Sequence, residues 1–230
     1  MAVGTAARLS RPARVRPTGD ARPDWERRLA RAGYARIAGL DEVGRGCWAG
    51  PLVAAAVILP RCTPRLVRRL AGLRDSKQLS PARRERLFDV LRDVAVSIGV
   101  GLVSAATLDL LGLSAAGQLA LERATRELVG PPDYLLIDAF RVPSLACPQE
   151  AIVFGDALCL SIAAASIIAK VERDRLLDEL GSRYPAYGFE RNKGYGTPEH
   201  ARALVEHGPT PEHRVSYAPV RAALQNGLVC

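Results

Sequence analysis

Four carboxylates of this sequence stand at the ends of apolar segments. Asp41 and Glu42 follow one such segment. Asp138 ends a later segment, and Asp156 comes two residues after the next one. Clusters of hard oxygen ligands hold two Mg²⁺ or Mn²⁺ ions about 3.5–4 Å apart in enzymes that hydrolyse phosphodiesters. The four acids therefore indicate metal-dependent hydrolysis of a phosphodiester.

Each acid also has a simpler explanation. Asp156 could cap the helix that follows it, and Asp138 could open a turn. The adjacent pair could lie solvated at the rim of a hairpin. Each of these explanations accounts for one place in the chain, so four acids in equivalent places favour a shared site. No His or Cys spacing typical of zinc accompanies them.

The sequence Gly44-Arg45-Gly46 just after the acid pair has the composition of an anion site. The two glycines allow φ > 0 and can turn backbone N–H groups toward an anion. Arg45 adds a planar guanidinium that matches a phosphate. An ordinary hairpin turn would use the same residues. Acids beside an anion cradle suggest a divalent cation and a phosphate held side by side.

The charge balance points to a polyanionic partner. The chain has 32 Lys and Arg against 24 Asp and Glu, a formal charge of +8. Only three of the 32 are lysines, namely Lys77, Lys170 and Lys193. Lysines that survive in a chain that otherwise uses arginine deserve a functional explanation, although chance is the alternative.

The five cysteines show neither a CxxC motif nor a metal-binding spacing. Their mostly apolar settings predict buried free thiols in a reducing compartment, the cytoplasm. The N-terminus lacks the apolar core of a secretory signal, and prolines interrupt the helix that a transit peptide would need. No apolar run reaches the length of a membrane span, so we expect a soluble protein.

The surrounding pattern predicts alternating strands and helices. Residues 35–40 and 52–59 are apolar runs joined by the glycine-rich turn, which predicts a hairpin. Ser80 and Pro81 are typical of a helix start. Further strands are expected at 94–103, 134–138 and 151–154, and helices at 81–94, 104–128, 157–180 and 198–207. This order predicts an α/β sheet covered by helices, with a ligand site beyond the strand ends.

Composition divides the chain into three parts. Residues 1–33 are basic and rich in proline and glycine, and we expect an arm without stable structure, apart from a short helix at 25–32, that touches nucleic acid non-specifically. Residues 34–220 are expected to form the catalytic domain, and residues 221–230 a short tail.

The motifs now in view closely resemble ribonuclease HII over residues 35–220. In chain order they are Gly-Leu-Asp41-Glu42-Val-Gly44-Arg45-Gly46, Asp75-Ser76-Lys77, Ile137-Asp138, Gly155-Asp156, Ser166-Ile-Ile-Ala-Lys170-Val-Glu-Arg173, Lys193-Gly-Tyr195-Gly-Thr197 and His213-Arg214. All three lysines fall inside these motifs. The resemblance implies an RNase H-like fold with a mixed five-stranded sheet flanked by helices and a helical C-terminal extension from about residue 184.

The resemblance also implies the activity. It implies an endoribonuclease that uses two divalent ions, Mn²⁺ or Mg²⁺. The substrates are RNA–DNA hybrids and duplex DNA with single embedded ribonucleotides. Cleavage 5′ of the ribonucleotide leaves a 5′-phosphate and a 3′-hydroxyl, as in ribonucleotide excision repair. The implied state is a cytoplasmic monomer without membrane contact.

Roles carry over to matching positions. Asp41, Glu42, Asp138 and Asp156 are implied to bind the ions. The backbone of Gly44-Arg45-Gly46 is implied to hold the 2′-OH and adjacent phosphates, the group that separates RNA from DNA. Substrate contacts are implied for Ser76, Lys77, Lys170 and Tyr195, with Tyr195 packing on the deoxyribose after the junction. Tyr195 could instead be an ordinary loop tyrosine. His200 and His213 receive no chemical role, and Asp75 could orient Lys77.

Some positions depart from the family pattern. Ala139 stands where glycine is usual, Phe154 where a basic residue is usual, and Gly112 where asparagine is common. None of these changes removes an implied metal ligand, so activity is expected. The related type HIII carries a folded N-terminal domain. The basic segment that precedes the motifs here is only about 35 residues long and is not expected to form one. A non-catalytic hybrid-binding protein would lack one of the four acids.

Overall fold

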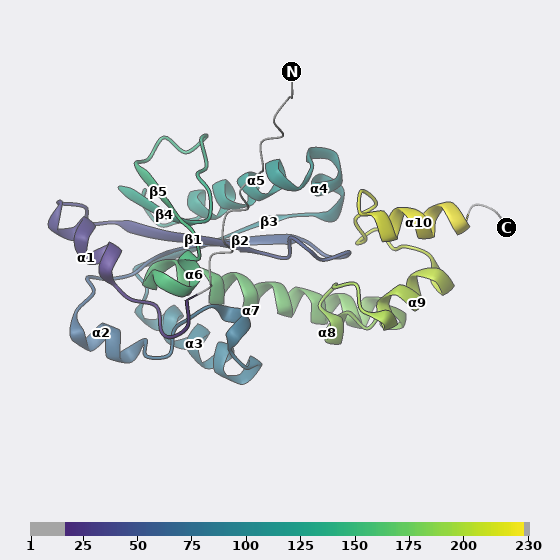
Figure 1. Cartoon of the computed structure of the whole chain (residues 1–230), viewed down its shortest axis with the longest axis horizontal. Helices are drawn as coiled ribbons and strands as arrows, with labels where there is room; N and C mark the ends of the chain where they lie inside the picture. The colour runs from purple at the N-terminus through teal and green to yellow at the C-terminus, as the bar shows by residue number, and fades with distance from the viewer. Residues whose placement is uncertain (1–16, 228–230) are drawn as a thin grey trace, which may run out of the picture.

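The computed structural model describes residues 17–227 of the 230-residue chain, and its centre is a five-stranded mixed sheet (Figure 1). The strands lie in the order β3-β2-β1-β4-β5. They are β1 Ile37–Val43, β2 Leu52–Ile58, β3 Ser97–Val103, β4 Tyr134–Asp138 and β5 Gln149–Ile152. β1 and β2 form the predicted antiparallel hairpin, while β4 runs parallel to β1. The predicted α/β fold with a mixed five-stranded sheet is confirmed.

The register of β1 explains how two of the acids meet. Leu40 of β1 lies beside Ile137 of β4 in a parallel pair. The next residues, Asp41 and Asp138, therefore lie at the same level on neighbouring strands. The sequence had suggested that Asp41 and Glu42 follow the strand. In the structure β1 continues through both residues, so the acid pair lies inside the strand. Pairing with β2 keeps the strand extended there, because Glu42 faces Ala54.

Helices cover both faces of the sheet. In Figure 1, α4 and α5 lie on one face and α3 and α7 on the other. The bounds are α2 Pro64–Arg69, η1 Ser76–Gln78, α3 Pro81–Val94, α4 Ala105–Leu111, α5 Leu113–Arg126, α6 Gly155–Leu158 and α7 Leu160–Arg183. Every residue of β2 is buried, because Val53, Ala55 and Val57 pack toward α3 and α7 while the alternate residues pack toward α5.

The central helix α7 passes unusually close to β1. A Cβ atom added at Gly39 would lie 2.1 Å from the backbone carbon of Ser161 at the start of α7. Only glycine allows this approach. Small residues of α7 that are fully buried, such as Ala163 and Ala165, belong to the same packing layer. The close approach brings Ser166 of α7 to the level of the acids.

The C-terminal extension forms a separate group of helices at one end of the sheet (Figure 1). It consists of η2 Pro185–Tyr187, α8 Phe189–Asn192, α9 Pro198–His207 and α10 Ala218–Gly227. The loop after β1 docks on it: Trp48 N–H donates to Gly194 O over 2.7 Å, and Gly50 N–H donates to Glu212 O over 2.9 Å. The predicted helix at 198–207 is confirmed, whereas the predicted tail from 221 is wrong because α10 continues to Gly227.

The N-terminal prediction needs a correction as well. The short helix expected at 25–32 is confirmed as α1 Asp24–Arg31, but the arm was expected to extend to residue 33, and this helix packs on the domain instead. Leu29 is buried in an apolar cluster, and the carboxylate of Glu26 accepts hydrogen bonds from the backbone N–H and the hydroxyl of Ser161, both over 2.7 Å. The part of the predicted arm at residues 1–16 lies outside the described residues.

Further boundaries differ from the sequence predictions. The strand expected at 94–103 begins at Ser97, because α3 continues through Val94. The single helix expected at 104–128 is divided into α4 and α5 at Gly112, whose φ is 78°. The helix expected from residue 157 starts at Leu160, after the short turn of α6. The strand expected at 151–154 lies two residues earlier, because Phe154 adopts a left-handed conformation with φ of 61°. The helix at 81–94 is confirmed.

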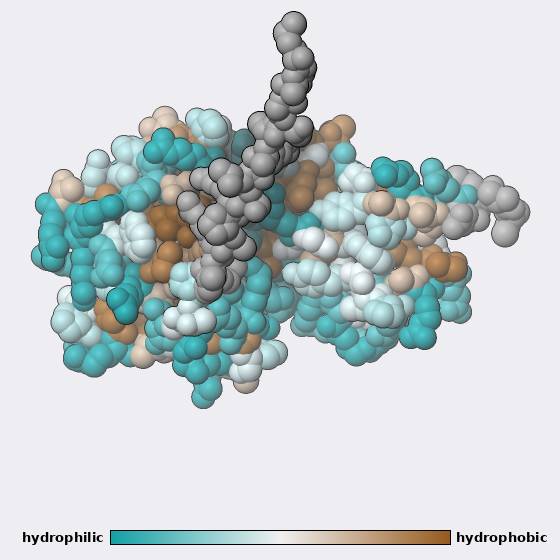
Figure 2. All heavy atoms as spheres, viewed as in Figure 1, coloured by the Kyte–Doolittle hydropathy of each residue, from teal (hydrophilic) through white to brown (hydrophobic). Residues whose placement is uncertain are grey.

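None of the helices in the described part of the chain is long and apolar enough to cross a membrane. In the view of Figure 2 the surface is mostly hydrophilic, with apolar residues in small groups.

Candidate active site

The structure brings the four predicted acids together. Asp41 is 7% exposed and Asp156 only 2%. The pKa of Asp41 lies well above its usual value, because burial and the charges of the other three acids, Glu42, Asp138 and Asp156, all oppose its ionisation. Burial also raises the pKa of Glu42, while Arg45 acts in the opposite direction. Mutual repulsion of this kind requires that the carboxylates share one small region.

Local hydrogen bonds orient the acids. Glu42 N–H donates to Asp41 Oδ1 over 2.8 Å, and Gly155 N–H donates to Asp138 Oδ1 over 2.7 Å. The second bond ties β4 to the turn that carries Asp156. Asp156 stands in the first turn of the short helix α6, so it is not the N-cap of the long helix, which begins at Leu160, as the helix-capping alternative had expected it to be.

Ser166 is a site residue whose role the sequence did not reveal. Its hydroxyl donates to Asp41, which favours the ionised carboxylate. The hydroxyl of Ser76 lies 3.0 Å from that of Ser166. Ser76 is only 3% exposed, so its hydroxyl is buried beside Ser166. No pattern of residue types distinguishes Ser166 from the other small residues of α7.

The donor set suits hard divalent cations. Oε1 of Glu42 accepts from Arg45 over 3.1 Å, but its Oε2 is buried without a hydrogen-bond partner. A buried carboxylate oxygen is costly unless a cation or a donor reaches it. Within residues 17–227, no three Asp, Glu, His or Cys side chains are placed so that they could hold a metal ion as they stand. The carboxylates would therefore have to turn toward an ion to bind it.

Two buried arginines hold the loop after β1. Arg173 and Arg214 are both 0% exposed. Arg173 donates to the backbone oxygens of Ala49 and Pro51 over 3.0 Å each, and to Lys193 O over 2.8 Å. The sequence showed both residues only as members of motifs. Their role is structural support of the glycine-rich loop.

Tyr195 lies beside this loop. Its side chain has a pKa raised first by burial and then by Cys47, to whose thiol its hydroxyl is hydrogen-bonded. Cys47 directly follows Gly46 in the chain. Tyr195 is still 40% exposed, so one part of its ring faces solvent while the hydroxyl is anchored. This placement fits a surface against which a sugar could pack.

The three lysines occupy different settings. Lys77 is exposed, and its charge acts on Glu42, so it lies near the acids. Lys170 is partly buried and pairs with Asp174 over 2.5 Å, and burial lowers its pKa. Lys193 pairs with Asp178 and donates to Asp174 O over 3.2 Å. Lys77 therefore has the clearest access to a bound anion.

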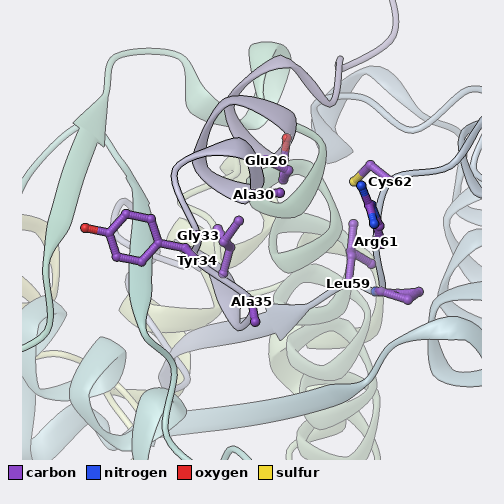
Figure 3. Close-up of a pocket in the computed structure, with 10 residues that line it drawn as sticks. Glu26, Ala30, Gly33, Tyr34, Ala35, Leu59, Arg61 and Cys62 are labelled. Carbon is purple, nitrogen blue, oxygen red and sulfur yellow. The ribbon is translucent and has the colours of Figure 1, made fainter.

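A cavity lies beside Ile37 at the start of β1, at the opposite end of this strand from the acid pair, and Figure 3 shows the residues that line it. It has a volume of about 340 Å³ and is bordered by α1, by the residues before β1 and by the segment after β2. Glu26, Tyr34 and Cys62 are among its lining residues. Burial, and then the charge of Glu26, raise the pKa of Cys62 to about 12, so this thiol is not a nucleophile at neutral pH. The cavity is separate from the acid site.

Comparisons with known proteins agree with this geometry. A family model described as Ribonuclease HII matches residues 38–220. A ribonuclease HII from Geobacillus thermodenitrificans is 54% identical over 200 residues, covering 87% of this chain and 75% of the relative. One from Chloroflexus aurantiacus is 50% identical over 199 residues, covering 86% and 94%. The crystal structure of the ribonuclease H2 from Pyrococcus horikoshii superposes with a TM-score of 0.71 at 28% identity, covering 85% and 100%.

Proposed function

Since the chain belongs to the ribonuclease HII family, whose members are metal-dependent endoribonucleases acting on RNA–DNA hybrids, we propose that it cleaves the phosphodiester on the 5′ side of a ribonucleotide. The substrates are RNA–DNA hybrids and duplex DNA that contains single ribonucleotides. The products carry a 5′-phosphate and a 3′-hydroxyl.

One observation carries this proposal: the glycine-rich loop continues directly from the strand that bears the acid pair. Asp41 and Glu42 end the buried part of β1, and Gly44-Arg45-Gly46 follow after one residue. A phosphate that the loop held would therefore lie next to the carboxylates. Tyr195, whose hydroxyl lies near Cys47 and whose side chain is 40% exposed, adds a surface against which a sugar could pack.

The four acids are the proposed ligands of the divalent ions. Asp41, Glu42, Asp138 and Asp156 would hold two divalent ions, Mn²⁺ or Mg²⁺, and the Ser166 hydroxyl, which favours the ionised form of Asp41, would help to orient it. Such ions, when bound, activate a water and stabilise the leaving 3′-oxygen. The buried Oε2 of Glu42 supports this assignment, because this oxygen could bind a metal ion and has no hydrogen-bond partner.

The chain's own groups would bind and select the substrate. Backbone N–H groups of Gly44-Arg45-Gly46 would bind the 2′-OH and the adjacent phosphate, since the hydroxyl is the feature that distinguishes RNA. Tyr195 would pack on the following deoxyribose. Lys77 and, after release from Asp174, Lys170 would contact phosphates. We assign Ser76 to the support of Ser166 and Asp41.

The remaining assignments concern the whole chain. We propose a catalytic domain that includes α1 and extends through α10, acting as a monomer in the cytoplasm. Four cysteines in the described residues are free thiols, which supports a reducing compartment: Cys47, Cys62, Cys147 and Cys159.

Cleavage of a labelled DNA duplex with one ribonucleotide tests the function. The reaction is run with Mn²⁺, Mg²⁺ or EDTA, beside an all-DNA duplex. We expect a metal-dependent nick 5′ of the ribonucleotide and a loss of at least about a thousandfold in Asp41→Asn and Asp138→Asn. Asp89→Asn, which changes an exposed acid of α3, is the matched control and should cleave normally. Binding without cleavage in either metal would contradict the proposal.

A further inference from the structure

The neighbouring residues His213 and Arg214 are among the most deeply buried polar residues, with 2% and 0% exposure. They lie just before α10 and form the edge contact of the C-terminal extension with the glycine-rich loop. Arg214 N–H donates to Trp48 O over 2.8 Å, and His213 forms an isolated β-bridge with Ala49. The side chain of Arg214 contacts the glycine-rich loop, and that of His213 reaches Tyr195 through His200.

Arg214 holds the inner side of the loop. Its Nη1 donates to Gly44 O over 2.6 Å and to Arg45 O over 3.3 Å. Its Nε and Nη2 donate to Gly50 O over 3.2 and 2.9 Å. The hydroxyl of Tyr217 also donates to Arg45 O. Because these carbonyl groups point inward to the guanidinium, the N–H groups of the following peptides point outward, as an anion cradle requires.

His213 reaches Tyr195 through a second histidine. The backbone N–H of Thr210 donates to His213 Nδ1 over 2.9 Å, so this nitrogen is an acceptor and the proton is on Nε2. His213 Nε2 lies 2.9 Å from His200 Nε2, and His200 Nδ1 lies 2.9 Å from Tyr195 O. A carbonyl only accepts, so His200 carries its proton on Nδ1. The two assignments are consistent: His213 Nε2–H donates to His200 Nε2, and His200 Nδ1–H donates to Tyr195 O, with both rings neutral.

The charge of Arg214 is also unusual. In the described part of the chain, this guanidinium has no carboxylate within ion-pair distance, and its partners are carbonyl groups and the hydroxyl and ring of Tyr217. Burying a cation without an opposite charge is costly, and an apolar side chain of similar volume is often the more stable choice. An orienting role for the loop, at a place where a phosphate would bind, explains why a guanidinium is used.

We propose that His213 and Arg214 are positioning residues that hold the Gly44–Gly46 loop and Tyr195 in register, and thereby set the preference for a ribonucleotide followed by a deoxyribonucleotide. Neither residue touches the substrate. Arg214 fixes the loop that would bind the 2′-OH, and His213 fixes, through His200, the backbone of the residue that would pack on the next sugar. The inference rests on the proposed function, because it concerns the spacing between the Gly44–Gly46 loop and Tyr195, the two elements proposed to contact the substrate.

The test compares two substrates with the full-length enzyme in Mn²⁺. One is duplex DNA with a single ribonucleotide, and the other is a continuous RNA–DNA hybrid without a deoxyribose after the cleavage site. The measured quantity is the ratio of the two kcat/KM values. This ratio does not depend on the fraction of folded enzyme, because unfolded molecules lower both values alike. Loss of stability alone would therefore leave it unchanged.

Disruptive and conservative variants are paired. His213→Leu and Arg214→Met should lower the ratio about tenfold, mainly through a higher KM on the single-ribonucleotide duplex. His213→Gln keeps a donor for His200 and should recover most of the ratio. Arg214→Lys keeps the charge, but its three donors share one nitrogen and do not span Gly44 O and Gly50 O as the planar guanidinium does, so it should recover little. If the Leu and Met variants do not fold, the Gln and Lys variants still differ in this predicted order.

Matched controls use the same residue types at exposed positions nearby. His207→Leu changes an exposed histidine of α9, and Arg221→Met an exposed arginine of α10; both should keep the wild-type ratio. Folded His213 and Arg214 variants that keep the wild-type ratio would overturn the inference. A wild-type enzyme that cleaves neither substrate would instead overturn the proposed function, so the two failures are distinguishable.

Discussion

Ala139 and Phe154 share a left-handed backbone conformation, each with φ of 61°, and each stands beside an acid of the site. Ala139 directly follows Asp138, and Phe154 precedes Asp156 by two residues. The two turns are joined by hydrogen bonds from Ala139 N–H to Ile152 O and from Gly155 N–H to Asp138 Oδ1. The acids of β4 and α6 are thus held by two turns that are strained for residues with a Cβ atom.

Substitutions at Ala139 should follow this strain. Ala139 is exposed, so a change of its side chain acts mainly through the backbone. We expect Ala139→Gly to be as stable as the wild type or up to about 1 kcal/mol more stable, and Ala139→Val to lose about 1–2 kcal/mol. Urea unfolding in EDTA measures both. Equal stability of the glycine and valine variants would contradict the conformation.

The same turns show what the sequence could and could not predict. Ala139 was noted as a departure from a glycine, but a sequence does not state that its backbone is left-handed. Phe154 was expected to end a strand, whereas its conformation ends β5 two residues earlier. Strongly periodic segments, such as α3 and α9, were predicted closely, because their caps and apolar faces are local properties.

A site residue could be predicted only where the neighbouring sequence indicates its role. The acids could be found because carboxylates at the ends of apolar segments are chemically unusual. Ser166, Arg173 and Arg214 could not be assigned roles, because each has a partner more than 100 residues away in sequence, namely Asp41, Pro51 and Gly44 respectively. Membership of a motif marked these residues without saying what they contact. Only the folded chain shows that Arg214 supports Gly44.

Neutralising Asp41 should separate activity from stability. Burial and three neighbouring carboxylates oppose its charge, so Asp41→Asn removes repulsion. We expect this variant to be inactive yet more stable than the wild type in EDTA, by about 1 kcal/mol or more. Adding Mn²⁺ should raise the wild-type melting temperature more than that of the variant, because a bound ion stabilises the folded state. A variant less stable than the wild type in EDTA would contradict this account of the site.

Glu26 should anchor α1 to the start of α7. Its Oε1 accepts from Ser161 N–H and Oγ, each over 2.7 Å, and from the thiol of Cys159 over 3.1 Å. Glu26→Ala would leave these buried donors without an acceptor and should cost about 2–4 kcal/mol. Glu26→Gln keeps a carbonyl oxygen and should cost less. Asp24→Ala, at an exposed position of the same helix, should change the unfolding free energy by under about 1 kcal/mol.

The histidine pair should make stability depend on pH. Burial, and then the neighbouring ring of His200, lower the pKa of His213 to about 4 from an ordinary value of 6.5. The folded state therefore favours the neutral ring, and this contribution is complete above about pH 6.5. It is lost as the pH falls from 6.5 toward 4. At about 1.4 kcal/mol per pKa unit, the loss is about 3 kcal/mol.

Urea unfolding in EDTA between pH 7 and pH 4 measures this loss. Many carboxylates also titrate in this range, so the informative quantity is the difference between the wild type and His213→Gln. Glutamine does not take up a proton, so we expect the variant to lose about 3 kcal/mol less than the wild type over the range. His207→Gln, which changes an exposed histidine, should follow the wild-type curve. Parallel curves for the wild type and His213→Gln would show that His213 is not held neutral by its contacts with His200 and Thr210.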